Sequence, residues 1–224
     1  MTRQVSSRAT PKNAHKSAWS RLITGNMLGI FERVVILLLF SYFAYRMLSA
    51  PPAKVGILTI LLVISESLSV ILILFQRKLN AYSDKPGDWM LGFAGASLSL
   101  LVVAEGPPAL LSQQICGGIM LVGLFVQISA KIILGRSFGI VAANRGVKVS
   151  GPYRVVRHPM YAGYIINHIG FLLAFPSLWN AALYSAELVI QVTRILREEA
   201  VLNRDKTYRD YAEQVRYRLV PMVF

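Results

Sequence analysis

The sequence is poor in cysteine and in charged residues of one sign. It has one cysteine, Cys116, and 11 Asp and Glu against 24 Lys and Arg in 224 residues. A single cysteine excludes an intrachain disulfide framework and any metal site that needs several cysteines. Charged residues make up 16% of the chain, whereas soluble domains have about 25%. In a soluble protein, a net charge of +13 would suggest a nucleic-acid partner. The low charged fraction and the mean hydropathy of +0.50 indicate a membrane protein instead, and we expect no nucleic-acid partner.

Several familiar active-site motifs are missing as well. No glycine-rich dinucleotide fingerprint follows a strand, and there is no phosphate-binding loop or nucleophile-elbow serine. His158, His168 and Cys116 do not have the spacing of zinc ligands. We therefore expect no metal site and no nucleotide-binding domain of the soluble type.

The hydrophobic residues fall into six apolar segments. A bilayer core of about 30 Å needs about 20 helical residues, so the last two segments only just cross it. We predict an all-α, polytopic transmembrane helical bundle with about six spans, the last two of which form a C-terminal helical hairpin. The segments are Ile30–Leu48, Val55–Phe75, Trp89–Ala104, Ile115–Leu134, Met160–Phe175 and Leu178–Val192.

The basic residues predict the orientation of these spans. If every segment crosses, 21 of the 24 Lys and Arg residues lie on one side of the membrane. Because cytoplasmic loops carry the excess of basic residues, both termini are predicted to be cytoplasmic. The protein is then an integral, multi-pass protein of the bacterial inner membrane or an equivalent membrane. The cytoplasmic pieces are 1–29, 76–88, 131–159 and 194–224.

The chain is predicted to have three parts. Residues 1–29 form a basic cytoplasmic tail, and 30–114 hold the first three transmembrane helices. Residues 115–224 form the core, with the last three spans, a glycine-rich basic loop at 135–159 and a cytoplasmic C-terminal helix. Most of the polar residues with helical spacing lie in this third part.

Both helices of the hairpin carry a polar face. On each helix, four polar residues follow one another at positions i, i+4, i+7 and i+11, which places them on one side. Such residues are rarely found on apolar segments without a cavity to receive them, so the two faces predict a polar pocket at the cytoplasmic end. Tyr161 and Tyr164 could equally be interfacial aromatics, and Glu198 a surface charge. The two sets are Arg157, Tyr161, Tyr164 and His168, then Glu187, Gln191, Arg194 and Glu198.

Two motifs flank this hairpin. The first is GPYRVVRHPMYAG at 151–163. The second combines Arg194, the pair Glu198–Glu199, Leu202, Tyr208, Tyr211, Val215 and an Arg-Leu-Val-Pro ending at 218–221. Together they resemble the isoprenylcysteine carboxyl methyltransferase family of integral membrane enzymes, over about residues 115–224. The resemblance implies a membrane methyltransferase that uses S-adenosyl-L-methionine without a Rossmann domain.

The resemblance also implies residue roles. In the family, the His-Pro-x-Tyr segment, the loop before it and the first acid of the pair surround the cofactor. Arg157 is added because it adjoins that segment. The residues so assigned to the cofactor are Gly146, Val147, Lys148, Tyr153, Arg157, His158, Pro159, Met160, Tyr161 and Glu198.

The acceptor of the methyl group is expected to be lipophilic and to enter from the bilayer. The resemblance assigns Arg194 to the substrate, and a planar guanidinium can orient a carboxylate without neutralising it. Tyr164 and His168, on the same polar face as the cofactor residues, are expected to contact the substrate too. A carboxylate such as that of an isoprenylcysteine needs no base, whereas an amine or thiol needs one, for which Glu199 or a tyrosine is the candidate.

Two other functions remain open at this point. A membrane reductase of the sterol type would use a nicotinamide cofactor, and the basic loop could bind its phosphate. A non-catalytic membrane scaffold would use the polar faces only to join helices.

Overall fold

The computed structural model describes the second half of the chain almost completely and the first half in parts. The described residues are 27, 30–31, 33–42, 45, 67–68, 70–75, 81–82, 86–103, 107–139, 143–144 and 146–224. The predicted tail 1–29, except Met27, and most of the second predicted span at 55–75 therefore lie outside the described residues.

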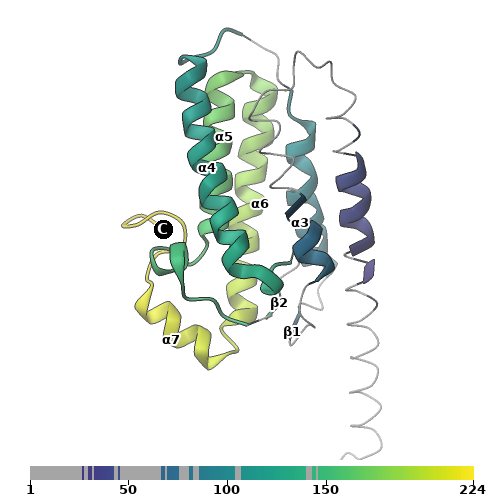
Figure 1. Cartoon of the computed structure of the whole chain (residues 1–224), viewed down its shortest axis with the longest axis vertical. Coiled ribbons are helices and arrows are strands. Elements are labelled where there is room, and N and C mark those ends of the chain that lie inside the picture. Colours follow the sequence, from purple (N-terminus) through teal and green to yellow (C-terminus); the bar gives the residue numbers. More distant parts are fainter. Residues whose placement is uncertain are drawn as a thin grey trace, which may run out of the picture.

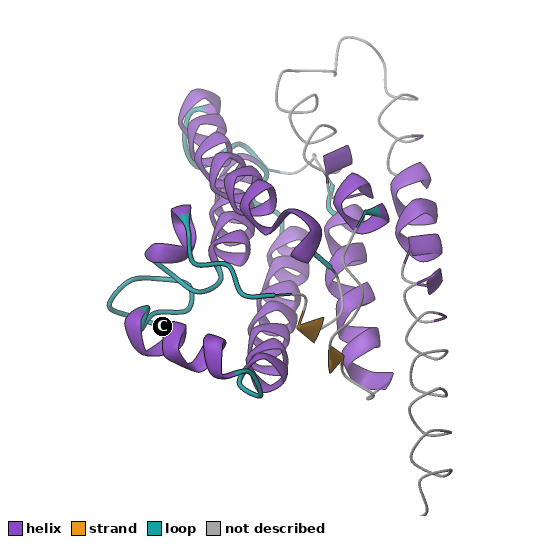
Figure 2. Ribbon diagram, turned by 60° about the horizontal axis from the view of Figure 1, so that its bottom comes forward, coloured by secondary structure: helices purple, strands orange, loops and turns teal. Residues whose placement is uncertain are grey.

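The described residues form a helical bundle with a short strand pairing at one end (Figure 1). The elements are β1 (Ala81–Tyr82), α3 (Pro86–Ser97), the 3-10 helix η2 (Leu98–Leu101), α4 (Gln113–Leu134), η3 (Gly135–Ser137), β2 (Ala143–Asn144), η4 (Gly151–Arg154), α5 (Pro159–Ala174), α6 (Leu178–Leu202) and α7 (Lys206–Gln214). Helices α3, α4, α5 and α6 run roughly side by side, while α7 lies across the lower end (Figures 1 and 2).

The predicted helical hairpin is confirmed as α5 and α6, joined by a turn at 175–177. Helix α6 does not end near Val192, where the apolar segment ends, but continues to Leu202 as one helix of 25 residues. The prediction of an all-α chain needs one addition. Strands β1 and β2 pair antiparallel over two residues each, which ties the loop at 135–159 to the segment before α3.

Helices α4 and α5 touch through backbone atoms. A Cβ atom on Gly123 would lie 2.6 Å from the backbone nitrogen of Asn167 and 2.7 Å from the carbonyl oxygen of Gly163. A Cβ on Gly163 would in turn lie 2.7 Å from the carbonyl oxygen of Gly123. Small residues allow helix backbones this close, as in many membrane helix pairs. The small residues of α5 at 163 and 170 thus face α4, as a close helix contact requires.

Helix α3 packs antiparallel against α6. Near the start of α3, the buried carboxylate of Asp88 lies 3.6 Å from Arg197 Nε. Two turns later, a Cβ on Gly95 would lie 3.2 Å from the Ile190 side chain. Seven residues forward on α3 therefore correspond to seven residues back on α6, which fixes the register of the pair.

The helix ends carry ordinary caps. Ser112 and Ser177 accept hydrogen bonds from the backbone N–H groups of Ile115 and Asn180 at the starts of α4 and α6. Asp205 does the same for α7, accepting from the N–H of Thr207 at 2.9 Å. Ser and Asp at this position satisfy N–H groups that have no partner within the helix.

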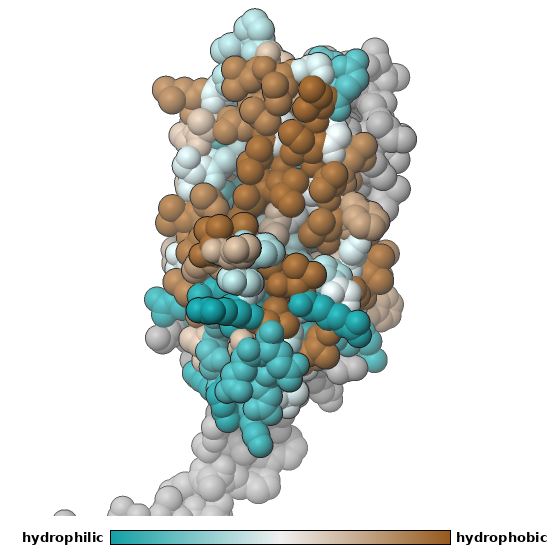
Figure 3. Space-filling model, turned by 90° about the vertical axis from the view of Figure 1, so that its left-hand side faces the viewer, coloured by the Kyte–Doolittle hydropathy of each residue, from teal (hydrophilic) through white to brown (hydrophobic). Residues whose placement is uncertain are grey.

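Hydrophobic and hydrophilic residues separate along the bundle. Figure 3 shows one face, with hydrophobic residues over the upper part and hydrophilic residues at the end where α7 lies. Among the described residues, one helical stretch, Gln113–Ser137, is long and apolar enough to cross a membrane, and a shorter apolar helix covers Arg33–Tyr42. The six-span topology stays a prediction.

The described basic pieces of the chain gather at one end of the bundle. The start of α3, the β1–β2 pairing and α7 all lie at the lower end in Figure 1. A cluster of buried hydrophobic side chains from α4, α5, α6 and α7, including Tyr161, Ile195 and Tyr208, underlies the same end. This arrangement fits the prediction that these pieces lie on one side of the membrane. That this side is the cytoplasmic one remains a prediction.

Candidate active site

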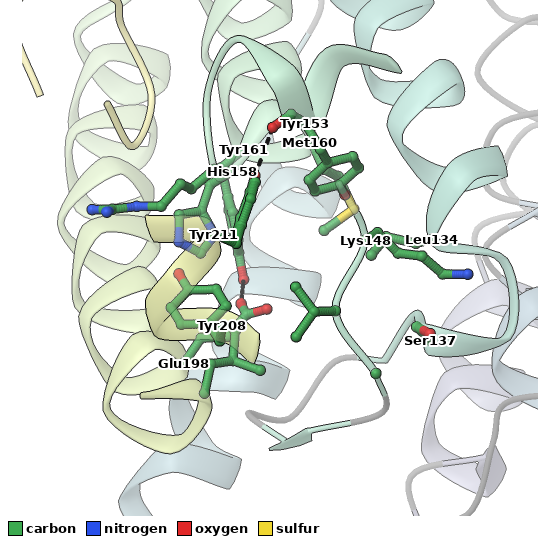
Figure 4. A pocket seen from close by; sticks show the side chains of 14 residues that line it. Leu134, Ser137, Lys148, Tyr153, His158, Met160, Tyr161, Glu198, Tyr208 and Tyr211 are labelled. Carbon is green, nitrogen blue, oxygen red and sulfur yellow. Dashed lines mark hydrogen bonds between the residues drawn. The ribbon is translucent and has the colours of Figure 1, made fainter. Parts of the chain in front are cut away.

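A cavity lies at the polar end, among the end of α6, helix α7 and the segment that precedes α5 (Figure 4). Its empty space measures about 580 Å³ when the part that opens to solvent is counted. Nine of the ten residues assigned to the cofactor line it, and Pro159 is the exception. The structure thus brings residues from several separate segments around one space. The lining residues are Leu134, Ser137, Gly146, Val147, Lys148, Tyr153, Arg157, His158, Met160, Tyr161, Glu198, Leu202, Tyr208 and Tyr211.

Glycine and proline shape the segment that leads into α5. Gly146 has a φ of 101° and Gly151 a φ of 56°, a region that residues with side chains rarely adopt. A Cβ on Gly151 would also collide with the side chain of Ile133 on α4. Pro159 is the first residue of α5, where its missing N–H removes no helical hydrogen bond. The chain can therefore turn sharply and start α5 with His158 at the cavity wall.

The C-terminal segment folds back over this turn. The backbone N–H groups at 157–158 donate to the carbonyl oxygens at 217–218, each at 2.9 Å. The buried hydroxyl of Tyr211 on α7 donates to the carbonyl oxygen of Tyr153 at 2.7 Å (Figure 4). These contacts hold two sides of the cavity together, although the segments are about sixty residues apart in sequence.

Glu199 is the centre of a buried polar cluster beside the cavity. Its side chain is only 7% exposed. Arg157 Nε lies 2.9 Å from its Oε1, His158 Nε2 and the Tyr208 hydroxyl each lie 3.2 Å from Oε1, and Arg218 Nε donates to Oε2 at 2.9 Å. The N–H of Arg157 does not point at the carboxylate, so that contact is an ion pair without a hydrogen bond.

These neighbours keep Glu199 ionised. Glu199 lies beyond the predicted span that ends at Val192. Burial raises the pKa of the carboxyl, but the hydrogen bonds from His158 and Arg218 and the charges of His158 and Arg157 outweigh it and lower the pKa to about 2. A carboxylate with this pKa is a poor proton acceptor near neutral pH. The structure therefore argues against Glu199 as a general base and places it as the anchor of His158.

Glu198, one residue earlier, faces the cavity instead. The hydroxyl of Tyr161 donates to Glu198 Oε2 at 3.3 Å (Figure 4). The two glutamates are about 100° apart around the helix, so their side chains point to different sides of α6 and contact different residues. Glu198 is thus the acidic group of the cavity wall, as the resemblance implied for the first acid of the pair.

Three tyrosines outside the predicted spans add neutral hydroxyl groups to the wall. Burial raises the pKa of Tyr153 and, with the charges of Glu199 and Glu198, that of Tyr208. Burial also raises the pKa of Tyr211 to about 12. All three hydroxyls therefore keep their protons at neutral pH.

The charged residues of the wall are of both signs. Lys148 and Arg157 face the same space as Glu198. Within the part of the chain that the structure describes, no three His, Cys, Asp or Glu side chains come together in a way that could hold a metal ion. The wall therefore offers one anion, two cations and several hydroxyls to a polar ligand.

The three residues assigned to the substrate lie next to the cavity and do not line it. The guanidinium of Arg194 lies 5.3 Å from the centroid of the Tyr161 ring. Along α5, the ring centroids of Tyr161 and Tyr164 are 6.5 Å apart, and those of Tyr164 and His168 are 6.4 Å apart. His168 stacks on Tyr184 of α6 with a centroid distance of 4.3 Å. An aromatic row thus leads from the cavity wall into the bundle.

Sequence reasoning left five lining residues unassigned. Leu134 and Ser137 come from the end of α4 and from η3, where no local pattern marks them. Leu202 was part of the second motif, as were Tyr208 and Tyr211, which are three residues apart and so share one face of a helix. Their role depends on the turn after α6, which brings α7 back over the cavity.

Two comparisons with known proteins bear on this site. Residues 112–210 match the family model of the phospholipid methyltransferases (PEMT), a stretch that includes α4, α5, α6 and most of the cavity wall. No curated protein matches the chain in sequence.

The second comparison is structural. The chain is similar to the solved structure of a eukaryotic intramembrane Ras methyltransferase, isoprenylcysteine carboxyl methyltransferase. The identity is 18%, the TM-score is 0.50, and the match covers 93% of this chain and 89% of that one. At this identity the likeness shows a shared fold. The family match favours a methyltransferase over the reductase and the scaffold. The family match over residues 112–210 and the shared fold over most of the chain together support an isoprenylcysteine carboxyl methyltransferase-like membrane methyltransferase.

Proposed function

We propose that this protein transfers a methyl group from S-adenosylmethionine to a lipophilic acceptor in the membrane. The donor would occupy the cavity at the polar end of the bundle. One observation carries the proposal: nine of the ten residues assigned to the donor line the same cavity, which brings the stretch 146–161 together with Glu198 of α6.

The chemistry of the wall fits such a donor. S-adenosylmethionine has a carboxylate, an amino group, ribose hydroxyls and a positively charged sulfonium. Lys148 can pair with the carboxylate, and Glu198 can accept from the amino group or a hydroxyl. The rings of Tyr153, Tyr208 and Tyr211 offer faces that attract a cation and stack on a base. The wall therefore has a partner for each polar part of the molecule.

The bound donor would supply a methyl group activated on a sulfonium, and S-adenosylhomocysteine would be the leaving group when an acceptor takes that methyl group in line. The protein's task is alignment and the exclusion of water, and positioning of this kind gives large rate gains. Tyr161 fixes the Glu198 carboxylate at the wall. Glu199 holds His158 and Arg218 together and so keeps the wall closed. Arg194, over the Tyr161 ring, would orient the acceptor's reacting group.

The acceptor would approach along the aromatic row of α5. Tyr164 and His168 carry this row from Tyr161 into the apolar part of the bundle. A lipid or prenylated small molecule could lay its chain among apolar helices while its polar end meets Arg194. A carboxylate acceptor would need no base. For an amine or thiol, the four neighbours of Glu199 argue against it as the base.

Calorimetry with S-adenosylhomocysteine on the detergent-purified protein tests the donor site. Glu198→Gln should weaken binding about tenfold or more, because it removes a charge-assisted acceptor worth about 1.5–3 kcal/mol. Glu213→Gln, on the exposed face of α7, is the matched control and should bind as wild type. Arg194→Ala should bind the probe normally, yet fail to methylate a membrane lipid extract given isotopically labelled donor.

Three results would contradict the proposal. The first is tight binding of a dinucleotide phosphate with no binding of S-adenosylhomocysteine. The second is equal binding by Glu198→Gln and wild type. The third is full turnover in Arg194→Ala, which would remove that residue from the reaction while leaving the donor site in place. Mass spectrometry of the labelled extract would identify the acceptor.

A further inference from the structure

Helix α3 lies directly against the side chain of Arg194. A Cβ atom on Gly95 would lie 2.9 Å from Arg194 Nη1 and 3.4 Å from Arg194 Cδ. Real Cβ atoms do not approach other heavy atoms to within 3.0 Å, so the guanidinium occupies the space that any other residue at 95 would fill. Figure 1 shows α3 alongside α6, the helix that carries Arg194.

The guanidinium of Arg194 also contacts the ring of Tyr161. Arg194 Cζ lies 5.3 Å from the ring centroid, within the range of an attractive cation–ring contact. Tyr161 in turn lines the cavity and donates to Glu198. The guanidinium therefore contacts both the bare backbone of α3 at Gly95 and the Tyr161 ring of α5.

A side chain at 95 would move the guanidinium more readily than the helix. Helix α3 also meets α6 away from Arg194, where Asp88 contacts Arg197 two turns below Gly95. The atom nearest to the added Cβ is the far end of a flexible side chain, which can swing aside. Ile190, whose Cγ2 would lie at 3.2 Å, needs to give by only a few tenths of an ångström.

We propose that Gly95 is a positioning residue for Arg194 and that α3 therefore forms part of the active site. The inference rests on the proposed function, in which Arg194 orients the acceptor. It goes beyond the predicted division of the chain, in which residues 30–114 lay outside the core, and beyond the family match, which begins at residue 112. Gly95 touches neither donor nor acceptor and acts through Arg194.

The Gly95→Ala variant tests this inference, with Gly87→Ala on the same helix as the matched control. A Cβ on Gly87 meets nothing within 4 Å, so both variants add one methyl group to α3 but only one of them meets Arg194. Alanine is favoured over glycine within helices, and the thermal midpoint of either variant should not fall. Loss of function in Gly95→Ala would therefore not come from unfolding.

We expect Gly95→Ala to bind S-adenosylhomocysteine as wild type does. Its turnover of the lipid extract should be about 10- to 100-fold lower, which is the effect of a misplacement of about 1 Å. Gly87→Ala should turn over normally. In the Arg194→Ala background, Gly95→Ala should cause no further loss, because the two changes remove the same interaction.

Other results would overturn the inference. Normal turnover in Gly95→Ala would do so, as would a loss that adds fully to that of Arg194→Ala. A fall in thermal midpoint with weaker donor binding would show a packing role only. Phenylglyoxal, which modifies guanidinium groups, gives a readout independent of turnover. Its rate at Arg194, followed by mass spectrometry, should differ in Gly95→Ala and match wild type in Gly87→Ala. If wild type methylates nothing, the proposed function fails, and the phenylglyoxal comparison still decides the role of Gly95.

Discussion

Replacing Glu199 by glutamine is the sharpest test of the polar cluster beside the cavity. Glutamine keeps the size of the side chain but removes the charge that faces Arg157, His158 and Arg218. It also brings an amide nitrogen, a donor, into a place where Tyr208 and Arg218 both donate. The change therefore leaves the buried Arg157 and the half-buried Arg218 without their anionic partner.

The size of the effect follows from the pKa of Glu199. A fall from the ordinary 4.5 to about 2 corresponds to about 3 kcal/mol of stability at neutral pH. Breaking a buried ion pair by removing one partner costs about 3–5 kcal/mol, which agrees. For a chain of this length, about 3 kcal/mol lowers the thermal midpoint by about 6–12 °C.

The stabilisation that Glu199 contributes should also depend on pH in a defined direction. Because the pKa of Glu199 is lower in the folded state, its stabilisation is complete above about pH 4.5. It is lost as the pH falls from there through the folded value of about 2. The midpoint of wild type, measured by scanning fluorimetry in detergent, should therefore exceed that of Glu199→Gln by a gap that closes over this range.

Glu198→Gln is the neighbouring control. Glu198 receives one hydrogen bond, from Tyr161 at 3.3 Å, worth about 1 kcal/mol. Its midpoint should fall by no more than about 4 °C. If Glu199→Gln instead unfolds within 2 °C of wild type, on the order of the scatter of such scans, the cluster does not stabilise the protein and the reasoning fails. Unchanged stability with a lost acidic limb in the pH–rate profile would return Glu199 to the role of a base.

Two further predictions concern the donor and the helix contact. Tyr161→Phe removes the hydroxyl that fixes Glu198, and S-adenosylhomocysteine should bind about fivefold more weakly by calorimetry, as expected for a hydrogen bond of about 1 kcal/mol; equal binding would show that Glu198 needs no partner. Gly163→Leu forces atoms into the backbone of α4 and should destabilise the protein by about 3 kcal/mol or more in thermal scans. Gly118→Ala, with nothing within 4 Å of its Cβ, should leave the thermal midpoint unchanged. If Gly163→Leu has the same midpoint as Gly118→Ala, α4 and α5 are not in close contact at Gly163.

Local sequence patterns predicted much of the second half of the chain. The hairpin of α5 and α6 followed from two apolar segments around Pro176, and the end of α4 at Leu134 matched the predicted boundary. The residues assigned to the donor came from a motif with fixed spacing, which keeps them near one another in any fold that preserves the motif. Periodicity works well here because the relevant residues share one helix or one turn.

Contacts between distant segments were not predictable in this way. The neighbours of Glu199 include Arg218, nineteen residues later, which reaches it only because the chain turns after α6 and runs back. Gly95 precedes Arg194 by almost a hundred residues, and an isolated glycine in an apolar segment looks the same whether it faces lipid or a guanidinium. The continuation of α6 past Val192 followed from the polar face that includes Arg194 and Glu198, whereas its end at Leu202 had no pattern to mark it.

The adjacent pair Glu198–Glu199 shows why the site needs both acids. A helix turns by about 100° per residue, so the two carboxylates point to different sides of α6. One side carries Tyr161 and the cavity, and the other carries His158 and the returning C-terminal segment. A single acid could serve the donor or hold the wall, but not both, because a carboxylate held by four neighbours has little capacity left for a ligand. Exchanging the roles would require a rotation of α6, and the contacts of Arg197 with Asp88 and of Ile190 and Arg194 with Gly95 oppose that rotation. Helix α3 thus fixes the direction of Arg194 and, through the register of α6, the direction of both glutamates.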